Sequence, residues 1–393
     1  MATSDTTSAT FVQNLIIGAG PAGLAVAGRL RQLGIPFEML EKSERIADAW
    51  HRHYDRLCLH TVKTLSHLPG LPFPEDYPLY VPRLKLVEYY QSYADKYQLH
   101  PMTGQEVVHL RRKKGIWLVR TPKQDFRAAN VVIATGANRV PAMPQWPGQE
   151  TFKGSLLHSS AYQNAKAWSG KKVLVVGMGN SGAEIALDLC ENGAETFLSI
   201  RGPVNIVPRD FWGNPTQKTA LMLSKLPYWL GDAIGVLLRK ITVGDLSRFG
   251  IRSPDIPPSK QLRVHGKTPV IDIGTVAKIK SGEIKVLPAI QRFTPDGVVF
   301  EDGTQLPFDA VILGTGYRTQ LTDFIEYTKG LLDENDLPRK VIGEGEFHGL
   351  YFVGFDNYTT GGTLGVINRD SEIVANVIAT QGAQWAEEAE LPE

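Results

Sequence analysis

The apolar and polar positions near the N-terminus predict a strand, a turn, a helix and a second strand. Residues 14–17 form a short apolar run that ends at Gly18, as a buried parallel strand does. Apolar residues then recur with helical spacing over 24–33, and a second apolar run over 37–40 ends at Glu41. This order, with an acid at the end of the second strand, is typical of a unit that binds a dinucleotide.

The turn before the helix carries three glycines with the spacing that such a unit requires. It reads Gly-Ala-Gly-Pro-Ala-Gly over 18–23. Gly18 allows a tight turn, Gly20 lets the backbone approach a pyrophosphate, and Gly23 allows close contact between helix and strand. The helix N-terminus stabilises phosphate charge, and Glu41 can accept hydrogen bonds from a ribose diol. Glycines also serve plain turns, but the full context favours nucleotide binding.

The same unit recurs 159 residues later along the chain. Residues 172–182 repeat the strand and the glycine turn, with all three glycines in equivalent places. The copies differ at the end of the second strand, where Ile200 stands in place of Glu41 and Arg201 follows it. An arginine without a neighbouring carboxylate favours a 2′-phosphate, so this copy predicts NADPH rather than NADH. One unit that ends in an acid and one that ends in an arginine together suggest FAD plus NADPH.

Two further strand ends indicate how the units are joined. Apolar runs at 131–134 and 310–313 each open into a turn of small residues. Because the first run leads into the second unit and the other follows it, we expect the second unit to be inserted into the first. The predicted fold is therefore α/β, with two Rossmann-like, three-layer domains. We expect a discontinuous FAD-binding domain over 11–163 and 308–383, and an NADPH-binding domain over 164–307 with a helical insert near 215–240.

Composition and charge exclude several other classes of protein. Apolar residues make up 42% and charged residues 21% of the 393, as in ordinary globular proteins. The net charge is +1, which gives no reason to expect binding to nucleic acid or to anionic lipid. The two cysteines, Cys58 and Cys190, form neither a ligand cluster nor a disulfide framework. We therefore expect no metal site and a reducing, cytoplasmic location.

The first residues and the most apolar stretch do not predict membrane insertion. Residues 1–10 lack the basic and apolar regions of a signal peptide. The apolar stretch 221–238 is interrupted by Lys225, Pro227 and Asp232, so it is too polar for a membrane span. We interpret this stretch as a pair of core or lid helices.

With these motifs identified, the chain resembles the flavin-containing monooxygenases. Their identifying pattern FxGxxxHxxxY appears as Phe152-Lys-Gly-Ser-Leu-Leu-His158-Ser-Ser-Ala-Tyr162, just before the second unit. Related Baeyer–Villiger enzymes usually carry Trp in place of Tyr162. We assign His158 a role in coupling the domains rather than in direct chemistry.

Within that family the chain is similar to the plant YUCCA branch over residues 12–380. The shared stretches lie at 46–50, 54–60, 71–78, 177–182, 266–274 and 278–286. One segment departs from the branch, because residues 355–365 are longer and more polar than the glycine-rich turn of the plant enzymes. The resemblance implies that this segment approaches the flavin, so the departure bears on the identity of the substrate.

The resemblance implies an enzyme that uses FAD, NADPH and O₂. NADPH reduces the flavin, O₂ then forms a 4a-(hydro)peroxyflavin, and an aryl 2-keto acid such as indole-3-pyruvate loses CO₂ to give indole-3-acetate, as in auxin biosynthesis. The partners would be the small-molecule substrate and O₂, for a chain that is a monomer or homodimer. A monooxygenase that oxygenates the N or S atom of amines or thioethers stays open, as does a non-catalytic redox sensor that binds FAD and NADPH. A dithiol–disulfide reductase would need a cysteine pair that this chain lacks.

The motifs and the resemblance together give the predicted site residues. Those for FAD are Gly18, Ala19, Gly20, Pro21, Ala22, Gly23, Glu41, Lys42, Trp50, Thr135, Gly136 and Asp356. Those for NADPH are Gly177, Met178, Gly179, Asn180, Ser181, Gly182, Ser199, Arg201 and Gly316. His60 is the candidate catalytic residue, because it ends a strand-like stretch where many flavin monooxygenases have Asn near the flavin. A structural hydrogen bond is the alternative role for His60.

Overall fold

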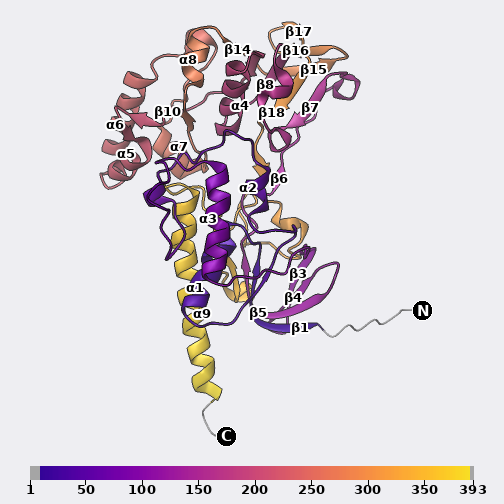
Figure 1. Ribbon diagram of the computed structural model, residues 1–393, viewed down its shortest axis with the longest axis vertical. Coiled ribbons are helices and arrows are strands. Elements are labelled where there is room, and N and C mark those ends of the chain that lie inside the picture. Colours follow the sequence, from indigo (N-terminus) through magenta and orange to yellow (C-terminus); the bar gives the residue numbers. More distant parts are fainter. Residues whose placement is uncertain (1–8, 390–393) are drawn as a thin grey trace, which may run out of the picture.

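The computed structural model describes residues 9–389 as two α/β units, each built around its own sheet (Figure 1). The first sheet consists of β1 (Thr10–Ile17), β2 (Glu38–Leu40), β3 (His109–Lys113), β4 (Ile116–Arg120), β5 (Asp125–Ile133) and β20 (Leu350–Phe352). Its order is β2-β1-β5-β4-β3, and β20 also pairs with β5. The end of β5, residues 131–133, lies between β1 and β20, both parallel to it, and is fully buried. Burial on both faces explains the unbroken apolar run there.

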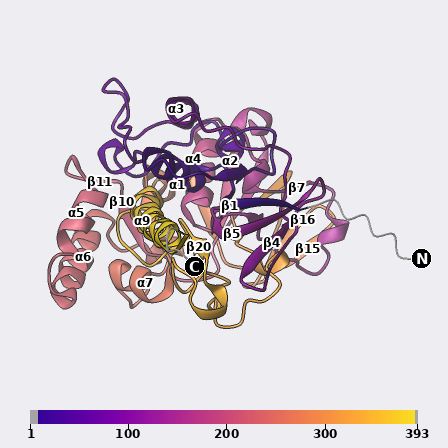
Figure 2. The same cartoon turned by 90° about the horizontal axis from the view of Figure 1, so that it is seen from below.

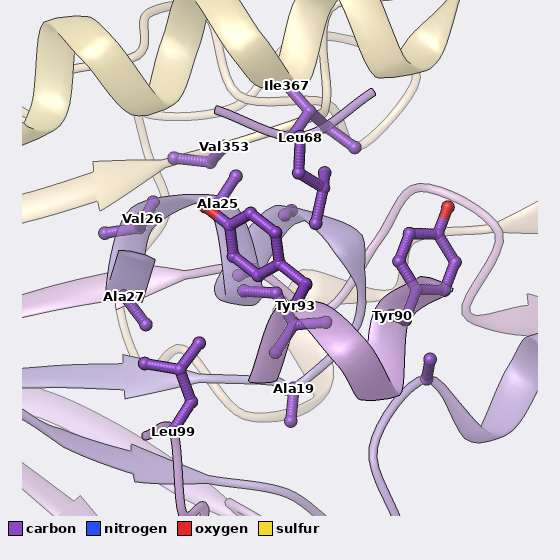
Figure 3. Packing of buried hydrophobic residues seen from close by; sticks show 14 of the residues in the cluster. Ala19, Ala25, Val26, Ala27, Leu68, Tyr90, Tyr93, Leu99, Val353 and Ile367 are labelled. Carbon is purple, nitrogen blue, oxygen red and sulfur yellow. The ribbon is translucent and has the colours of Figure 1, made fainter. Parts of the chain in front are cut away.

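Helices pack on one face of the first sheet, whereas residues of β4 and of the segment 321–347 cover the other face. The helices are α1 (Pro21–Gln32), α2 (Asp48–Arg52), α3 (Arg83–Lys96) and α9 (Thr363–Ala389). Figure 3 shows Tyr93 of α3 lying against Ala25 and Val26 of α1. The Tyr93 hydroxyl donates to the Pro69 carbonyl at 3.0 Å, and a Cβ on Gly28 would lie 2.2 Å from that hydroxyl. Gly28 therefore makes the space that the Tyr93 ring occupies.

The second sheet contains the second glycine turn. Its strands are β7 (Ser155–His158), β8 (Lys172–Val176), β9 (Glu195–Ser199), β14 (Ile284–Leu287) and β18 (Ala310–Leu313), in the order β14-β9-β8-β18-β7 and all parallel. The helices α4 (Asn180–Glu191) and α8 (Thr275–Lys280) pack on it, and β15 (Ile290–Thr294), β16 (Gly297–Phe300) and β17 (Gln305–Pro307) form a separate antiparallel sheet. This second sheet is wholly parallel, whereas the first combines a parallel part, β2-β1-β5-β20, with the antiparallel strands β4 and β3. The parallel parts with their helical crossovers confirm the predicted α/β fold.

The sheet pairings refine the expected domain boundaries. The boundaries at 163/164 and 307/308 place β7 and β18 in the FAD-binding part, whereas both strands are hydrogen-bonded within the second sheet. The chain leaves the first sheet after β5 and returns to it at β20, so the second unit is inserted as expected. The two crossings run side by side, because β6 (Val140–Pro141) pairs antiparallel with β19 (Tyr317–Arg318).

The predicted helical insert projects from the second unit. It contains α5 (Thr216–Leu223), α6 (Tyr228–Thr242) and α7 (Pro258–His265), together with the short pairs β10 (Ile206–Pro208) with β13 (Val270–Asp272) and β11 (Asp210–Phe211) with β12 (Asn214–Pro215). Figures 1 and 2 place α5 and α6 at one edge of the molecule, away from both sheets. Among the described residues, none of the helices combines the length and the apolar character needed to cross a membrane.

Candidate active site

A cavity of about 1070 Å³ lies where the two units and the helical insert meet. Pockets for drug-sized ligands span about 300–1000 Å³, so this one has room for part of a cofactor and a substrate. Its wall includes the first glycine turn, residues 47–61, and the segment 354–367. The second unit contributes residues 180–181, and the insert contributes side chains from α5, α6 and α7.

The first glycine turn has the geometry that phosphate binding requires. Gly18 has φ +107°, and a Cβ there would lie 2.6 Å from the Ala134 carbonyl oxygen. A Cβ on Gly23 would lie 1.9 Å from the Gly18 carbonyl oxygen, so both of these glycines are required by the fold itself. A Cβ on Gly20 would meet no atom within 4 Å, and Gly20 lines the cavity. The space above Gly20 therefore fits a ligand's phosphates at the N-terminus of α1.

Glu41 is held in the cavity wall by backbone donors. Its Oε2 accepts the Ala19 N–H at 2.8 Å and its Oε1 accepts the Ser43 N–H at 2.9 Å. Each carboxylate oxygen has a further lone pair, so the group can still accept from a ribose hydroxyl. Lys42 also lines the cavity, next to Glu41.

The other residues predicted for FAD also converge on this cavity, whose wall includes Trp50, Thr135, Gly136 and Asp356. The Thr135 hydroxyl is buried and has no hydrogen-bond partner in the described structure, which suits a bound polar group. Burial alone would raise the pKa of Asp356, but hydrogen bonds from Thr359 and Arg369 outweigh it, and the pKa is lowered. Asp356 is thus an ionised acceptor at neutral pH.

The second glycine turn repeats the first in detail. Gly177 has φ +96°, and a Cβ on Gly182 would lie 2.0 Å from the Gly177 carbonyl oxygen. A Cβ on Gly179 would meet nothing within 4 Å, as at Gly20. The residues present therefore fit a second dinucleotide at the N-terminus of α4.

Of the other residues predicted for NADPH, some line the cavity and some are buried away from it. Asn180 and Ser181 line the cavity, and the Asn180 side-chain oxygen accepts the Ile271 N–H at 2.7 Å. The Met178 side chain is instead buried in the core of the second unit. Ser199 is also turned away, since its buried hydroxyl donates to the Pro288 carbonyl at 2.7 Å. The structure therefore does not bring every predicted NADPH residue to one surface.

Arg201 lies exposed directly after β9, where the second unit lacks an acid. We expect Arg201→Ala to raise the KM for NADPH about ten- to a hundredfold, because a charge-assisted contact to the 2′-phosphate contributes about 1.5–3 kcal/mol. The KM for NADH, which lacks that phosphate, should stay nearly unchanged. Steady-state kinetics with both coenzymes measure the difference, and equal weakening of both would make Arg201 a structural residue.

His60 lines the cavity opposite α4 of the second unit. Its Nε2 lies 3.5 Å from Oε2 of Glu184 but makes no hydrogen bond. Glu184 is only 2% exposed, and its Oε2 accepts the Tyr54 hydroxyl at 2.7 Å. Burial and the Glu184 charge raise the pKa of Tyr54 well above its ordinary value, so Tyr54 remains a neutral donor. Glu184 therefore links two side chains of the first unit.

Glu184 is one of three carboxylates that α4 presents to residues 54–60. Asp188 accepts the buried Tyr162 hydroxyl at 2.6 Å. Arg56 lies 3.4 Å from Asp188 and 2.8 Å from Glu191. Because these acids are three or four residues apart, they share one face of α4. This face fixes the second glycine turn, at the start of α4, relative to the wall around His60.

His158 joins the two crossings, as its predicted coupling role requires. Its Nδ1 lies 3.1 Å from the Ser160 N–H, and its Nε2 lies 3.0 Å from the Gly316 carbonyl. Nδ1 must accept and Nε2 must donate, which fixes one neutral tautomer. The Gly316 carbonyl thus accepts hydrogen bonds both from His158 Nε2 and from the Ala142 N–H.

Burial lowers the pKa of His158 below its ordinary value, although the Gly316 carbonyl opposes this shift. The unfolded chain then takes up a proton at a higher pH than the folded one, so stability is lost as pH falls from about 6.5 through the folded pKa. We expect thermal unfolding to show wild type more stable than His158→Gln above pH ~7, with the gap narrowing towards pH ~5. A gap that does not change with pH would contradict this assignment.

Gln217 on α5 ties the helical insert to the cavity wall. Its side-chain oxygen accepts the Val62 N–H at 2.8 Å, and its amide donates to the Gly361 carbonyl at 2.6 Å. Gly361 belongs to the segment 355–365, which departs from the plant branch and does line the cavity. Sequence reasoning missed Gln217 and Glu184. Glu184 gave one signal, since it recurs with Asp188 and Glu191 at helical spacing among apolar residues.

Comparison with known proteins agrees with this geometry. The sequence profile of the flavin-binding monooxygenase-like family matches residues 15–336. The chain is 38% identical to the probable indole-3-pyruvate monooxygenase YUCCA7 of Arabidopsis thaliana, over 95% of this chain and 88% of that protein. It is also 38% identical to the indole-3-pyruvate monooxygenase YUCCA1 of Oryza sativa subsp. japonica, over 95% and 92%.

A solved structure shares the fold. Cyclohexanone monooxygenase from Rhodococcus sp. Phi1, bound to NADP⁺, superposes with a TM-score of 0.72 at 19% identity, covering 96% of this chain and 85% of that one. At this identity the likeness shows the arrangement of the two units and nothing about the substrate.

Proposed function

This chain belongs to the flavin-binding monooxygenase-like family, and on that premise we propose that it converts an aryl 2-keto acid, with indole-3-pyruvate as the first candidate. It is an NADPH-dependent flavoprotein monooxygenase with FAD and NADPH as cofactors. The observation that supports this choice of substrate is the 38% sequence identity, over 95% of the chain, to proteins named indole-3-pyruvate monooxygenases. The product would be the arylacetate, formed with loss of CO₂.

The two glycine turns divide the cofactors between them. The turn at 18–23, with Glu41 and the unpaired Thr135 hydroxyl, would hold FAD. The turn at 177–182, followed by Arg201, would hold NADPH. Bound FAD, once reduced by NADPH, supplies the activated oxygen that reaches the substrate.

The chain's own side chains position the substrate and exclude water. His60 is the polar group of the cavity wall that we assign to a substrate oxygen, and the Glu184 carboxylate lies behind it, 3.5 Å from Nε2. The helices α5 and α6 contribute an apolar part of the cavity wall, here called the ceiling, which consists of Ala220, Leu223 and Leu238. Because Gln217 holds this ceiling to residues 62 and 361, the apolar wall stays in place and would limit the entry of bulk water while oxygen is transferred.

The reaction is tested by supplying purified enzyme with NADPH, O₂ and a panel of aryl keto acids, amines and thioethers. We expect indole-3-pyruvate or phenylpyruvate to give the arylacetate and CO₂ in amounts equal to the NADPH consumed. Mass spectrometry identifies the products, and ¹⁸O₂ should place labelled oxygen in the new carboxylate.

The alternatives give different results in the same assay. If keto acids yield no product while an amine or thioether gains oxygen, the segment 355–365 has reshaped the cavity for an N- or S-oxygenating enzyme. A redox sensor would hold both cofactors and oxidise no NADPH in step with any product. We propose a cytoplasmic location for the protein. Cys58 and Cys190 are free thiols, and the reducing cytoplasm would keep them reduced.

A further inference from the structure

The helix α6 is apolar on the side that faces solvent as well as on the side that faces the cavity. Gly231, Gly235 and Leu238 line the cavity. Trp229, Ala233, Leu237 and Ile241 are exposed and follow one another at intervals of four residues, so they form one stripe along the helix. Trp229 is 74%, Leu237 57% and Ile241 59% exposed. A surface helix normally presents polar residues there.

Further exposed apolar side chains lie close to this stripe in the chain. Of the sixteen large apolar side chains that are exposed among the described residues, seven fall within 212–264. They are Trp212, Met222, Tyr228, Trp229, Leu237, Ile241 and Val264. We call these seven residues the outer patch. Met222 belongs to α5, and Tyr228, Trp229, Leu237 and Ile241 belong to α6; these two helices form one edge of the molecule (Figure 2). Such concentrations of exposed apolar side chains mark interaction sites.

The charge around the outer patch is strongly positive. Residues 212–267 contain nine Lys and Arg but three Asp and no Glu, a net charge of +6 in a chain whose total is +1. The acid on α6, Asp232, is paired with Arg263 at 2.9 Å. Lys218, Lys225 and Lys240 are exposed and form no ion pair within residues 9–389.

We propose that the outer patch docks on an anionic lipid surface, with α6 lying in the plane of the headgroups. Exposed Trp and Tyr suit the boundary between headgroups and acyl chains, and unpaired lysines beside an apolar helix face suit anionic lipid. No described helix crosses a membrane, so the contact is peripheral. The inner faces of the same helices line the cavity, so docking places the cavity ceiling against the lipid.

Charge argues against a second copy of the chain as the occupant. A symmetric dimer through the outer patch would set the same lysines of two copies face to face. Like charges at an interface are repulsive, whereas anionic headgroups are complementary to this surface.

The test is co-sedimentation of the full-length, flavin-loaded protein with vesicles. Vesicles of phosphatidylcholine with about 30% phosphatidylserine should bind it, and pure phosphatidylcholine vesicles should bind it at least tenfold less. Binding should fall steeply between ~0.05 M and ~0.5 M salt. The double variant Trp229→Ser/Leu237→Ser should lose at least tenfold in partition coefficient, and each of Lys218→Glu, Lys225→Glu and Lys240→Glu about fivefold or more.

Matched controls lie outside the outer patch. Leu84→Ser removes a side chain on α3 that is 61% exposed, and Lys329→Glu reverses an exposed charge in the first unit. Both should bind vesicles as the wild type does. Flavin content measured on every variant shows that it is folded.

Two results would overturn the proposal. The first is that neither vesicle type binds the wild type at low salt, or that the controls weaken binding as much as the patch variants. The second is that the wild type binds no vesicles but is a dimer in light scattering, and that Trp229→Ser/Leu237→Ser is a monomer. This result would make the outer patch a contact between two copies of the chain.

Discussion

Replacing Gly20 by valine is expected to give a folded protein that carries no flavin. A Cβ at position 20 meets no protein atom within 4 Å, so we expect the chain to accept a valine there, but its side chain fills the space in front of the N-terminus of α1. The pyrophosphate of FAD can then no longer reach the backbone N–H groups. Absorbance at the flavin wavelengths, set against protein concentration, should fall from near one flavin per chain to below about a tenth.

The repeat supplies the matched control for Gly20→Val. Gly179 has the same open surroundings in the second unit, so Gly179→Val should keep its flavin and raise the KM for NADPH at least a hundredfold, about 3 kcal/mol. Gly23→Ala differs from both, because its Cβ would lie 1.9 Å from a carbonyl oxygen and should prevent folding of the first unit. Full flavin content in Gly20→Val would refute the assignment of the first turn to FAD.

Replacing Glu184 by alanine is expected to destabilise the contact between the units and to uncouple NADPH oxidation from product. The Tyr54 hydroxyl would lose its acceptor in a buried place, which costs about 1–3 kcal/mol, and His60 would lose the carboxylate that lies 3.5 Å from its Nε2. The midpoint temperature of thermal unfolding should fall by about 5 °C. The ratio of H₂O₂ to product should rise with indole-3-pyruvate as substrate.

Glu184→Gln separates the two roles of this residue. Its amide oxygen can still accept from Tyr54, so thermal stability should largely recover, but the charge beside His60 is gone and uncoupling should persist. If Glu184→Gln matches the wild type in both measurements, His60 needs no charged partner. Tyr54→Phe provides the converse control, since it removes the hydrogen bond and leaves the carboxylate beside His60.

The local parts of the site were predictable from sequence because each follows from a short stretch of chain. One helix separates the glycines at 18, 20 and 23 from the acid at 41. Backbone geometry alone decides which positions of the turn must be glycine. The repeat at 177–182 obeys the same geometry, so the second turn was predicted equally well. The cofactors followed from the residue at the end of each second strand.

The long-range parts were not predictable in this way. The short strand sequences at 155–158 and 310–313 do not reveal which sheet they join, and both belong to the second one. Ser199 ends a strand in which side chains alternate between faces, and its hydroxyl points to Pro288 rather than to the cavity. Glu184 and Gln217 act on residues more than a hundred positions away, so only the folded chain shows their partners.

The position of β20 has a consequence for the order in which the chain folds during synthesis. β20 completes the first sheet beside β5, but the ribosome makes it only after the whole inserted unit. The second unit can therefore fold as soon as β18 emerges, while the end of β5, residues 131–133, waits with one side open. An open strand edge is prone to pairing with other chains, so the interval between β5 and β20 is when the nascent protein most needs a chaperone.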